Sequence, residues 1–293
     1  MRAMTDSAIY RAELDEHGWT VIPGVVDSDT VATTCRAAMK HRPSTTKNGS
    51  QWDGFASFPF DDDELTRLVL DARILRCVRA LLGSDTPRLT RSSLWVKVGG
   101  HADYDQPLHA DYPEHTLVVP RQNGAYREVK GYLYLTDVRA DTGATRLISL
   151  TKTEALSRER QWFDSPEFAA LSEQEVPAAG SAGSVLFMTP DVVHRGANIT
   201  VAGAVRVTVS FTYAASSWPW IGSTPWAREL HRRQKSELIP ALSLTARSAL
   251  GFPAPEDPYW TAGTIAAVAR RYPDLDMRPY RESMERRCLK ATP

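Results

Sequence analysis

The segment 206–213 has the most regular pattern in the chain, because polar and apolar residues alternate at every position. Successive side chains of a strand point to opposite faces, so Arg, Thr, Ser and Thr share one face and Val, Val, Phe and Tyr the other. Shorter strand-like segments occur at 19–22, 93–98, 129–138 and 184–188, several of them followed by Gly-containing turns. Many short strands separated by turn signals predict a β-sandwich or barrel.

Helical patterns flank this strand-rich part. Residues 9–16 form a short amphipathic helix, and Asp27 to Asp29 offer N-caps for a second helix that continues to about Lys40. Leucines and valines at helical spacing predict one core-packed helix over 64–82. Residues 41–63 are polar and irregular, so we expect a solvated connection there.

Apart from one duplicated tetrapeptide, the chain shows no internal repeat, and no low-complexity linker or shift of composition divides it. The stretch 151–182 is helical and loop-like, and helix and loop patterns return after the last strand. We therefore predict a single domain over residues 1–293. It comprises a helical N-terminal part (1–88), a strand-rich core (89–213) and a helical C-terminal part (214–293).

Composition and charge narrow the class of protein. Of 293 residues, 42% are hydrophobic and 24% charged, and 35 Lys and Arg balance 35 Asp and Glu. A net charge of zero removes the electrostatic case for nucleic acid or an anionic membrane surface as a partner. Cys35, Cys77 and Cys288 form no Cys-x-x-Cys pair, so a disulfide framework and a structural zinc site are not expected.

The sequence contains no apolar run of membrane-spanning length and no signal-peptide pattern at Met1. A cytoplasmic location is therefore the expectation, with no membrane and no nucleic-acid partner. The sequence does not define an oligomeric state.

A candidate metal motif lies at 106–112, Gln-Pro-Leu-His-Ala-Asp-Tyr. His109 and Asp111 are two residues apart, so in an extended segment both side chains point to the same face. His194 is the best candidate for a third ligand that the fold brings in. Two histidines and one carboxylate on one face leave three coordination positions open, which is the ligand set of non-haem Fe(II) oxygenases.

The tetrapeptide His-Ala-Asp-Tyr occurs twice, at 101–104 and at 109–112. The first copy follows Gly99-Gly100, which favours a loop. The second copy lies before a stretch, 112–119, that we expect to be extended and to hold the side chains rigidly. We favour the second copy, and His101 with Asp103 remains the alternative.

Arg206 lies twelve residues after His194, where we expect the next antiparallel strand to return beside it. The planar guanidinium of arginine makes two charge-assisted hydrogen bonds to a carboxylate. A metal site with open positions beside an inward arginine describes a pocket for a dicarboxylate cosubstrate. The alternative is a strand arginine that points to solvent.

The motifs carry a resemblance to a known family. The chain resembles the phytanoyl-CoA dioxygenase family of Fe(II)/2-oxoglutarate-dependent oxygenases from Gly18 to the strand at 206–213. The best-matching segments are 108–112, 134–138 with 143–146, and 193–198. The resemblance implies a mainly β fold with flanking helices and a double-stranded β-helix (jelly-roll, cupin-like) core.

The resemblance also assigns roles to particular residues. It implies His109, Asp111 and His194 as iron ligands, Arg206 as partner of the distal carboxylate of 2-oxoglutarate, and Gln106 and Thr145 as hydrogen-bonding partners of that cosubstrate. Where family members often have a Pro-Gly-Ser-His run, this chain has Leu147–Lys152. That segment lines the pocket mouth in the family, so the difference bears on the substrate.

These assignments imply an enzyme that uses Fe(II), 2-oxoglutarate and O₂ to hydroxylate an unactivated carbon of a small organic metabolite, with release of succinate and CO₂. Desaturation, ring closure or epimerisation by the same oxidant is the alternative outcome. Two further alternatives are a cupin-type metalloenzyme without a cosubstrate and a silent small-molecule-binding member of the fold. Arg121, Arg195 and Lys97 are candidates to hold an anionic group, although surface placement is the more common situation for each.

Overall fold

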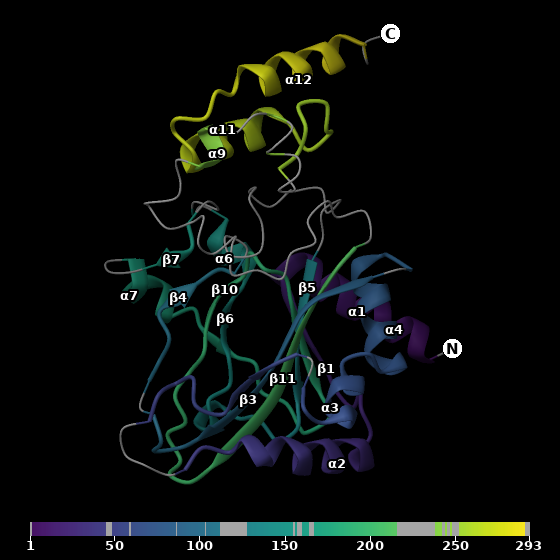
Figure 1. The fold of residues 1–293 in the computed structure, drawn as a ribbon, viewed down its shortest axis with the longest axis vertical. Helices are drawn as coiled ribbons and strands as arrows, with labels where there is room; N and C mark the ends of the chain where they lie inside the picture. The colour runs from purple at the N-terminus through teal and green to yellow at the C-terminus, as the bar shows by residue number, and fades with distance from the viewer. Residues whose placement is uncertain are drawn as a thin grey trace. The chain divides into compact units, whose positions relative to one another are not determined.

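A computed structural model describes most of the chain. The described residues are 2–44, 49–58, 60–85, 87–102, 104–111, 128–154, 156, 160–163, 167–215, 238–241, 244, 247 and 252–290. Two antiparallel sheets with flanking helices form the strand-rich part, which confirms the mainly β fold with a jelly-roll, cupin-like core (Figure 1).

The larger sheet has six strands. Their order is β1 (Trp19–Ile22), β9 (Val185–Met188), β5 (Glu128–Tyr134), β11 (Val205–Ala214), β3 (Arg88–Val98) and β2 (Phe55–Ser57). The smaller sheet has five strands, in the order β7 (Trp162–Phe163), β4 (Leu108–His109), β10 (Val193–Arg195), β6 (Arg146–Ile148) and β8 (Val176–Pro177). In both sheets the order of the strands differs from their order along the chain, as expected when strands alternate between two layers.

Short and long helices accompany the sheets. Before the core lie α1 (Arg2–His17), α2 (Ser28–Ala38), η1 (Met39–His41), α3 (Asp63–Leu68) and α4 (Ala72–Leu82). Within it lie η2 (Ala140–Thr142), α6 (Leu150–Thr153) and α7 (Glu167–Ser172), and after it α9 (Leu238–Ala241), α11 (Ala262–Arg271) and α12 (Arg278–Lys290). No helix in the described part of the chain is long and apolar enough to span a membrane.

Contacts between residues divide the chain into two compact units. The first consists of Met1–His109, Arg127–Ala155 and Trp162–Ser216, and holds both sheets; the second consists of Ala110–Tyr126, Leu156–Gln161 and Ser217–Pro293. In the second unit, the ring of Trp260 packs at 4.3 Å from that of Tyr280, and buried Arg247 donates to the Tyr280 hydroxyl. That the whole chain behaves as one domain stays a prediction.

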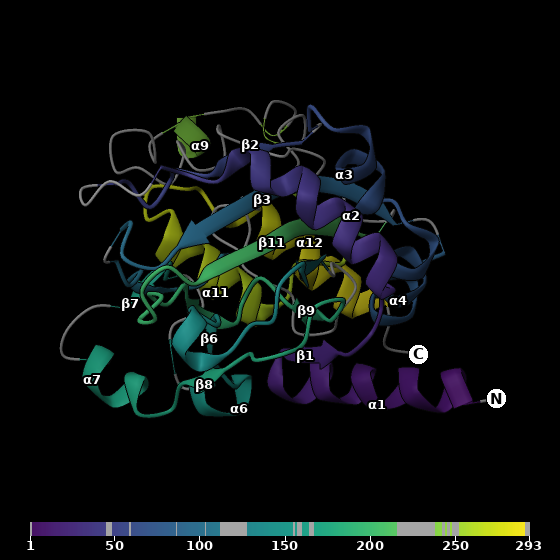
Figure 2. The same ribbon diagram turned by 90° about the horizontal axis from the view of Figure 1, so that it is seen from below.

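The two faces of β11 have different surroundings. Val207, Val209, Phe211 and Tyr213 belong to one buried cluster with apolar residues of α2, α3 and α4. In Figure 1 the larger sheet stands between these helices and the smaller sheet, and Figure 2 shows α2 crossing the direction of β3. The polar face, which includes Arg206 and Thr208, is therefore turned toward the smaller sheet and is equally buried.

The predicted helix over 64–82 is wrong in one respect, because two helices occupy it. The chain leaves helical conformation between Leu68 and Ala72, where the side chain of Asp71 accepts a hydrogen bond from the backbone of Arg73 and caps α4. A carboxylate at this position satisfies an unpaired N–H of the new helix. The leucine spacing continues across the break, which is why the periodicity alone does not reveal it.

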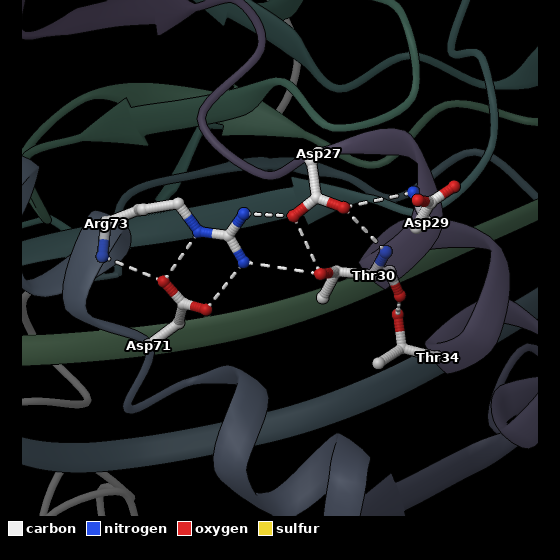
Figure 3. A network of polar contacts seen from close by, with 6 residues as sticks. All are labelled: Asp27, Asp29, Thr30, Thr34, Asp71 and Arg73. Atoms are coloured by element: carbon white, nitrogen blue, oxygen red, sulfur yellow. Dashed lines mark hydrogen bonds and ion pairs between the residues drawn. The ribbon is translucent and has the colours of Figure 1, made fainter.

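Arg73 connects the caps of two helices (Figure 3). Its guanidinium makes two hydrogen bonds to Asp71, at 2.9 and 2.8 Å, and a third to Asp27, which caps α2. The carboxylate of Asp27 also accepts hydrogen bonds from the backbone and the hydroxyl of Thr30. These bonds fix the starts of α2 and α4 relative to one another.

Two further expectations need correction. The connection 41–63 is not wholly irregular, since β2 adds an edge strand to β3 with Phe55 opposite Trp95. The stretch 151–182 holds two short strands, β7 and β8, besides its helices. Strands of two residues carry too little alternation for a pattern to indicate them.

Candidate functional site

His109 and His194 are direct cross-strand neighbours. β10 pairs with β4 so that His194 lies opposite His109, and the centroids of the two imidazole rings are 4.4 Å apart. Paired strands hold opposite side chains on the same face, so both rings lie together. The side chain of His194 is 2% exposed, and the ring of Trp162 lies 5.1 Å from that of His109.

Both rings are oriented in the same way by backbone carbonyls. Nδ1 of His109 donates to the Pro107 carbonyl at 2.8 Å, and Nδ1 of His194 donates to the Val192 carbonyl at 2.9 Å. A carbonyl only accepts, so the proton of each neutral ring is on Nδ1 and the lone pair is on Nε2. Metal-ligating histidines characteristically donate their other ring N–H to such an acceptor.

Asp111 completes a group that fits a metal ion. Ligand atoms of His109, Asp111 and His194 all lie within 4.8 Å of one another, and Asp111 is buried. Two imidazoles and one carboxylate are the donor set of non-haem Fe(II) sites. The structure thus brings together the three residues expected to form a metal centre.

The first copy of the repeated tetrapeptide has another role. His101 is buried, and its Nε2 donates to a carboxylate oxygen of Asp53 at 2.8 Å. Asp103 lies outside the described residues. His101 therefore fastens the segment 49–54 to the end of β3, and it is not among the described residues grouped around the candidate metal site.

A cavity opens beside His194. Its wall on the larger sheet consists of every second residue of three neighbouring strands, within 91–97 of β3, 130–134 of β5 and 206–212 of β11, together with Phe211. His194, Gly196, Gln106, Val138 and Thr145 form the rest of the wall that bears on the site. The polar face of β11 that the alternation predicts is thus a cavity wall.

Arg206 is a buried cation in this wall. It is 7% exposed, and its Nε has no hydrogen-bond partner among the described residues. Burial lowers the pKa of the guanidinium, while the neighbouring phenols of Tyr134 and Tyr132 raise it. Arginine stays protonated in proteins, so a positive charge is held here at a substantial desolvation cost.

The expected strand pairing of Arg206 with His194 is wrong. β10 belongs to the smaller sheet and β11 to the larger one, so the chain crosses between layers after Arg195. Both residues line the same cavity from opposite sheets. A spacing of twelve residues fits a hairpin as well as a crossover, and the sequence does not distinguish them.

Gln106 has a structural role in addition to lining the cavity. The side-chain Oε1 of Gln106 accepts a hydrogen bond from the backbone N–H of Gly196 at 2.9 Å, and the backbone N–H of Gln106 donates one to the Gly196 carbonyl. These bonds hold the segment after His194 beside the segment before His109. Thr145 lines the cavity and is half-buried. Cosubstrate contacts of both residues stay predictions.

Gly143 lets a turn approach Arg206 closely. Its φ is +80°, and a Cβ there would lie 2.8 Å from the Ala197 carbonyl oxygen and 3.1 Å from Nη1 of Arg206. Glycine is thus required both by the backbone conformation and by the space beside the guanidinium.

Three further cations line the cavity, Lys97, Arg91 and Lys130. The sequence did not indicate Arg91 or Lys130 as site residues. Lys97 was expected at the surface, but burial and the charge of Arg206 lower its pKa to about 8. Alternation along β3, where Arg91, Ser93, Trp95 and Lys97 share one face, was the available signal. Arg195, the other candidate to hold an anion, makes two hydrogen bonds to Glu175 and an ion pair to Asp105. Arg121 and the tryptophans at 218, 220 and 226 lie outside the described residues.

Comparison with known proteins gives one family. The sequence pattern of the family Phytanoyl-CoA dioxygenase (PhyH) matches residues 14–206, and no match was found among curated proteins.

Several solved structures share the fold. One is the epimerase SnoN in complex with Fe3+, alpha ketoglutarate and nogalamycin RO, with 19% identity, TM-score 0.56, and 73% of this chain and 85% of that chain covered. Another is the carbocyclase SnoK from nogalamycin biosynthesis, with 19% identity, TM-score 0.56, and 71% and 83% covered. A third is EctD from S. alaskensis with 2-oxoglutarate and 5-hydroxyectoine, with 20% identity, TM-score 0.55, and 72% and 76% covered.

Proposed function

Because the chain belongs to the phytanoyl-CoA dioxygenase family, we propose that it is an Fe(II)- and 2-oxoglutarate-dependent oxygenase acting on a small organic molecule. One observation carries the proposal beyond family membership: buried Arg206, whose Nε lacks a described hydrogen-bond partner, lines the same cavity as His194. A desolvated guanidinium is stable only if a carboxylate or similar group meets it.

The residues divide the binding of iron and cosubstrate between them. Nε2 of His109, Nε2 of His194 and a carboxylate oxygen of Asp111 would hold Fe(II). Arg206 would bind the distal carboxylate of 2-oxoglutarate through its planar fork. Bound iron and 2-oxoglutarate would supply an oxidant made from O₂, with succinate and CO₂ as by-products.

The protein fixes the geometry of this site in advance. The carbonyls of Pro107 and Val192 keep both imidazoles in the tautomer that presents Nε2. The bidentate pair of Arg195 with Glu175 and the bonds of Gln106 to Gly196 hold β10 in place around His194. Preorganised ligands lose little entropy when a metal binds, and buried walls keep water from the reaction.

Hydroxylation of an unactivated carbon is the outcome we propose. A carboxylate ligand, Asp111, favours oxygenation, since related halogenases lack that carboxylate. Epimerisation or ring closure is the second candidate, because the similar structures include an epimerase, SnoN, and a carbocyclase, SnoK. Desaturation is a further outcome of the same oxidant, and all of these share one metal and cosubstrate site.

Anaerobic titration of 2-oxoglutarate into the Fe(II)-loaded protein tests the proposal. We expect the weak visible charge-transfer band of a chelated 2-keto acid. Glutarate, which lacks the keto group, is the matched control and should produce no band. Absence of the band with 2-oxoglutarate would favour a metalloenzyme without a cosubstrate or a silent binding protein of the same fold.

A further inference from the structure

The cavity wall carries positive charge at two separate places. Arg206 and Lys97 form one pair at the start of β11, as cross-strand neighbours. The other pair is Arg91 of β3 and Lys130 of β5, which both lie opposite Thr212 of β11, one on each side. Adjacent strands are about 4.8 Å apart, so Arg91 and Lys130 flank Thr212 on a wall about 10 Å wide.

A single cosubstrate molecule does not extend to both pairs. Arg206 and Thr212 are six positions apart on β11, which corresponds to about 20 Å of strand. A five-carbon dicarboxylate that bridges Arg206 and the metal occupies only the part of the cavity next to Arg206. The part next to Arg91 therefore lies beyond the reach of that molecule.

The balance of charge in the wall is one-sided. Among the described lining residues there are four cationic side chains, Arg91, Lys97, Lys130 and Arg206, and no carboxylate. The next side chain along β5 on this face, Glu128, is buried outside the lining and accepts a hydrogen bond from Thr90. Like charges that share a cavity repel one another, and the same field attracts an anion.

Arg91 is the cation in this wall best placed to receive a ligand. Its side chain is exposed, it reaches the cavity, and it makes no hydrogen bond or ion pair with the described residues. Next to it are the hydroxyls of Ser93 and Ser210, which bond to each other at 2.7 Å, and the indole of Trp95. Nζ of Lys130 lies 4.9 Å over the ring of Tyr132, on the cavity side of β5.

We propose that the organic substrate of this oxygenase is an anion, whose carboxylate or phosphate group is bound by Arg91, with Lys130 and Thr212 beside it. The inference rests on the proposed function, because it takes the Arg206 end of the cavity to be filled by 2-oxoglutarate. The aromatic and hydroxyl-bearing middle of the wall, Trp95, Tyr132 and Ser210, would then contact the body of the substrate between the anionic group and the metal.

Binding of simple probes tests the proposal without knowledge of the natural substrate. The protein is loaded with Zn(II), which is not redox-active, and saturated with 2-oxoglutarate. Dissociation constants of 4-fluorobenzoate, 4-fluorophenyl phosphate and 4-fluorobenzamide are then measured by fluorine NMR. We expect at least one of the two anions to bind at least about tenfold more tightly than the neutral amide, and the tighter anion identifies the class, carboxylate or phosphate ester.

Variants assign the preference to Arg91. Arg91→Gln should raise the dissociation constant of the anion about tenfold and leave that of the amide unchanged. Arg91→Lys should retain part of the preference for the anion, because the positive charge remains. Arg67→Gln, at an exposed arginine of α3, is the matched control and should have no effect. Equal binding of anion and amide, or an anion affinity that Arg91→Gln does not change, would overturn the inference.

The two proposals fail in different ways. If the Zn(II) protein does not bind 2-oxoglutarate, the proposed function fails, whatever the probes do. If 2-oxoglutarate binds and the probes show no preference for anions, only the anionic substrate is refuted.

Discussion

Lys97 lies directly opposite Arg206 in the antiparallel ladder between β3 and β11, and both side chains line the cavity beside His194. Like charges directly opposite each other destabilise a sheet. Burial and the guanidinium together lower the pKa of Lys97 to about 8. A dianion bound in this part of the cavity would offset the repulsion between the two cations.

The affinity for 2-oxoglutarate should therefore depend on pH through Lys97. Its pKa in the folded protein lies below the usual 10.5, so the ammonium is lost as the pH rises through about 8. A bound carboxylate favours the charged form, and the dissociation constant should rise above pH 8. Lys97→Met should bind more weakly below that pH and lose the dependence. An identical pH profile in both proteins would show that Lys97 does not act on the cosubstrate.

Metal retention should distinguish the two copies of the repeated tetrapeptide. We expect His109→Ala and His194→Ala to lose Fe(II) or Zn(II) during gel filtration, because each removes a ligand atom from the group with Asp111. His101→Ala should keep the metal and lower the unfolding free energy, because it removes the hydrogen bond to Asp53. Metal content by elemental analysis and urea denaturation measure the two effects. The opposite pattern of metal loss would move the site to the first copy.

Gly143→Ala should lower the affinity for 2-oxoglutarate without loss of the bound metal. The added methyl group would lie 3.1 Å from Nη1 of Arg206, and the positive φ adds about 1 kcal/mol of backbone strain. Gly203→Ala is the matched control, since its φ is +73° and nothing lies within 4 Å of the added Cβ. Gly143→Ala should lose more stability than Gly203→Ala, since its Cβ would also lie 2.8 Å from the Ala197 carbonyl oxygen, and only Gly143→Ala should change the affinity measured by titration. Equal cosubstrate affinities would exclude a role for this turn in positioning Arg206.

The network around Arg73 should contribute to stability at neutral pH. Hydrogen bonds from Arg73 hold the pKa of Asp71 below its usual 3.8. A carboxyl whose pKa is lower in the folded state stabilises the protein above pH 3.8, and the contribution disappears as the pH falls through the lower folded value.

Asp71→Ala should accordingly cost about 1 kcal/mol or more of unfolding free energy at pH 7, since it also removes the cap of α4. The loss should shrink in acid. Asp63→Ala, which breaks an exposed pair with Arg67 on α3, should cost less than about 1 kcal/mol. Urea denaturation at pH 7 and in acid measures the unfolding free energies of the two variants. An equal loss for both variants at pH 7 would contradict the role of the network.

Much of the strand-rich core could be predicted from local pattern. Segments 19–22 and 206–213 match β1 and β11 closely. Alternation over the whole of 206–213 identifies both the conformation and the faces of β11, whereas 19–22 is a short β-rich segment bounded by glycine and proline. The break at Asp71 was missed because leucine spacing continues through it. The edge strand β2 was missed because pairing with β3, and not its own sequence, makes it a strand.

The candidate site could be predicted as far as short-range spacing reaches. The spacing of His109 and Asp111 implies a shared face, whereas the approach of His194 depends on the register of β10 against β4. Whether β11 pairs with β10 or lies in the other sheet is a long-range property, and the expectation of a hairpin was wrong. Arg91, Lys97 and Lys130 come together only when three strands are aligned, so no single segment indicates their cluster.

Titration of 2-oxoglutarate into Fe(II)-loaded Arg206→Ala protein tests the central claim most directly. Charge-assisted hydrogen bonds contribute about 1.5–3 kcal/mol each, and 1.4 kcal/mol is a factor of ten in affinity. We expect a dissociation constant at least about tenfold higher than in the unaltered protein, partial recovery in Arg206→Lys, and full iron content in both variants. An unchanged dissociation constant in folded, iron-loaded Arg206→Ala protein would contradict the assignment of this cavity to 2-oxoglutarate.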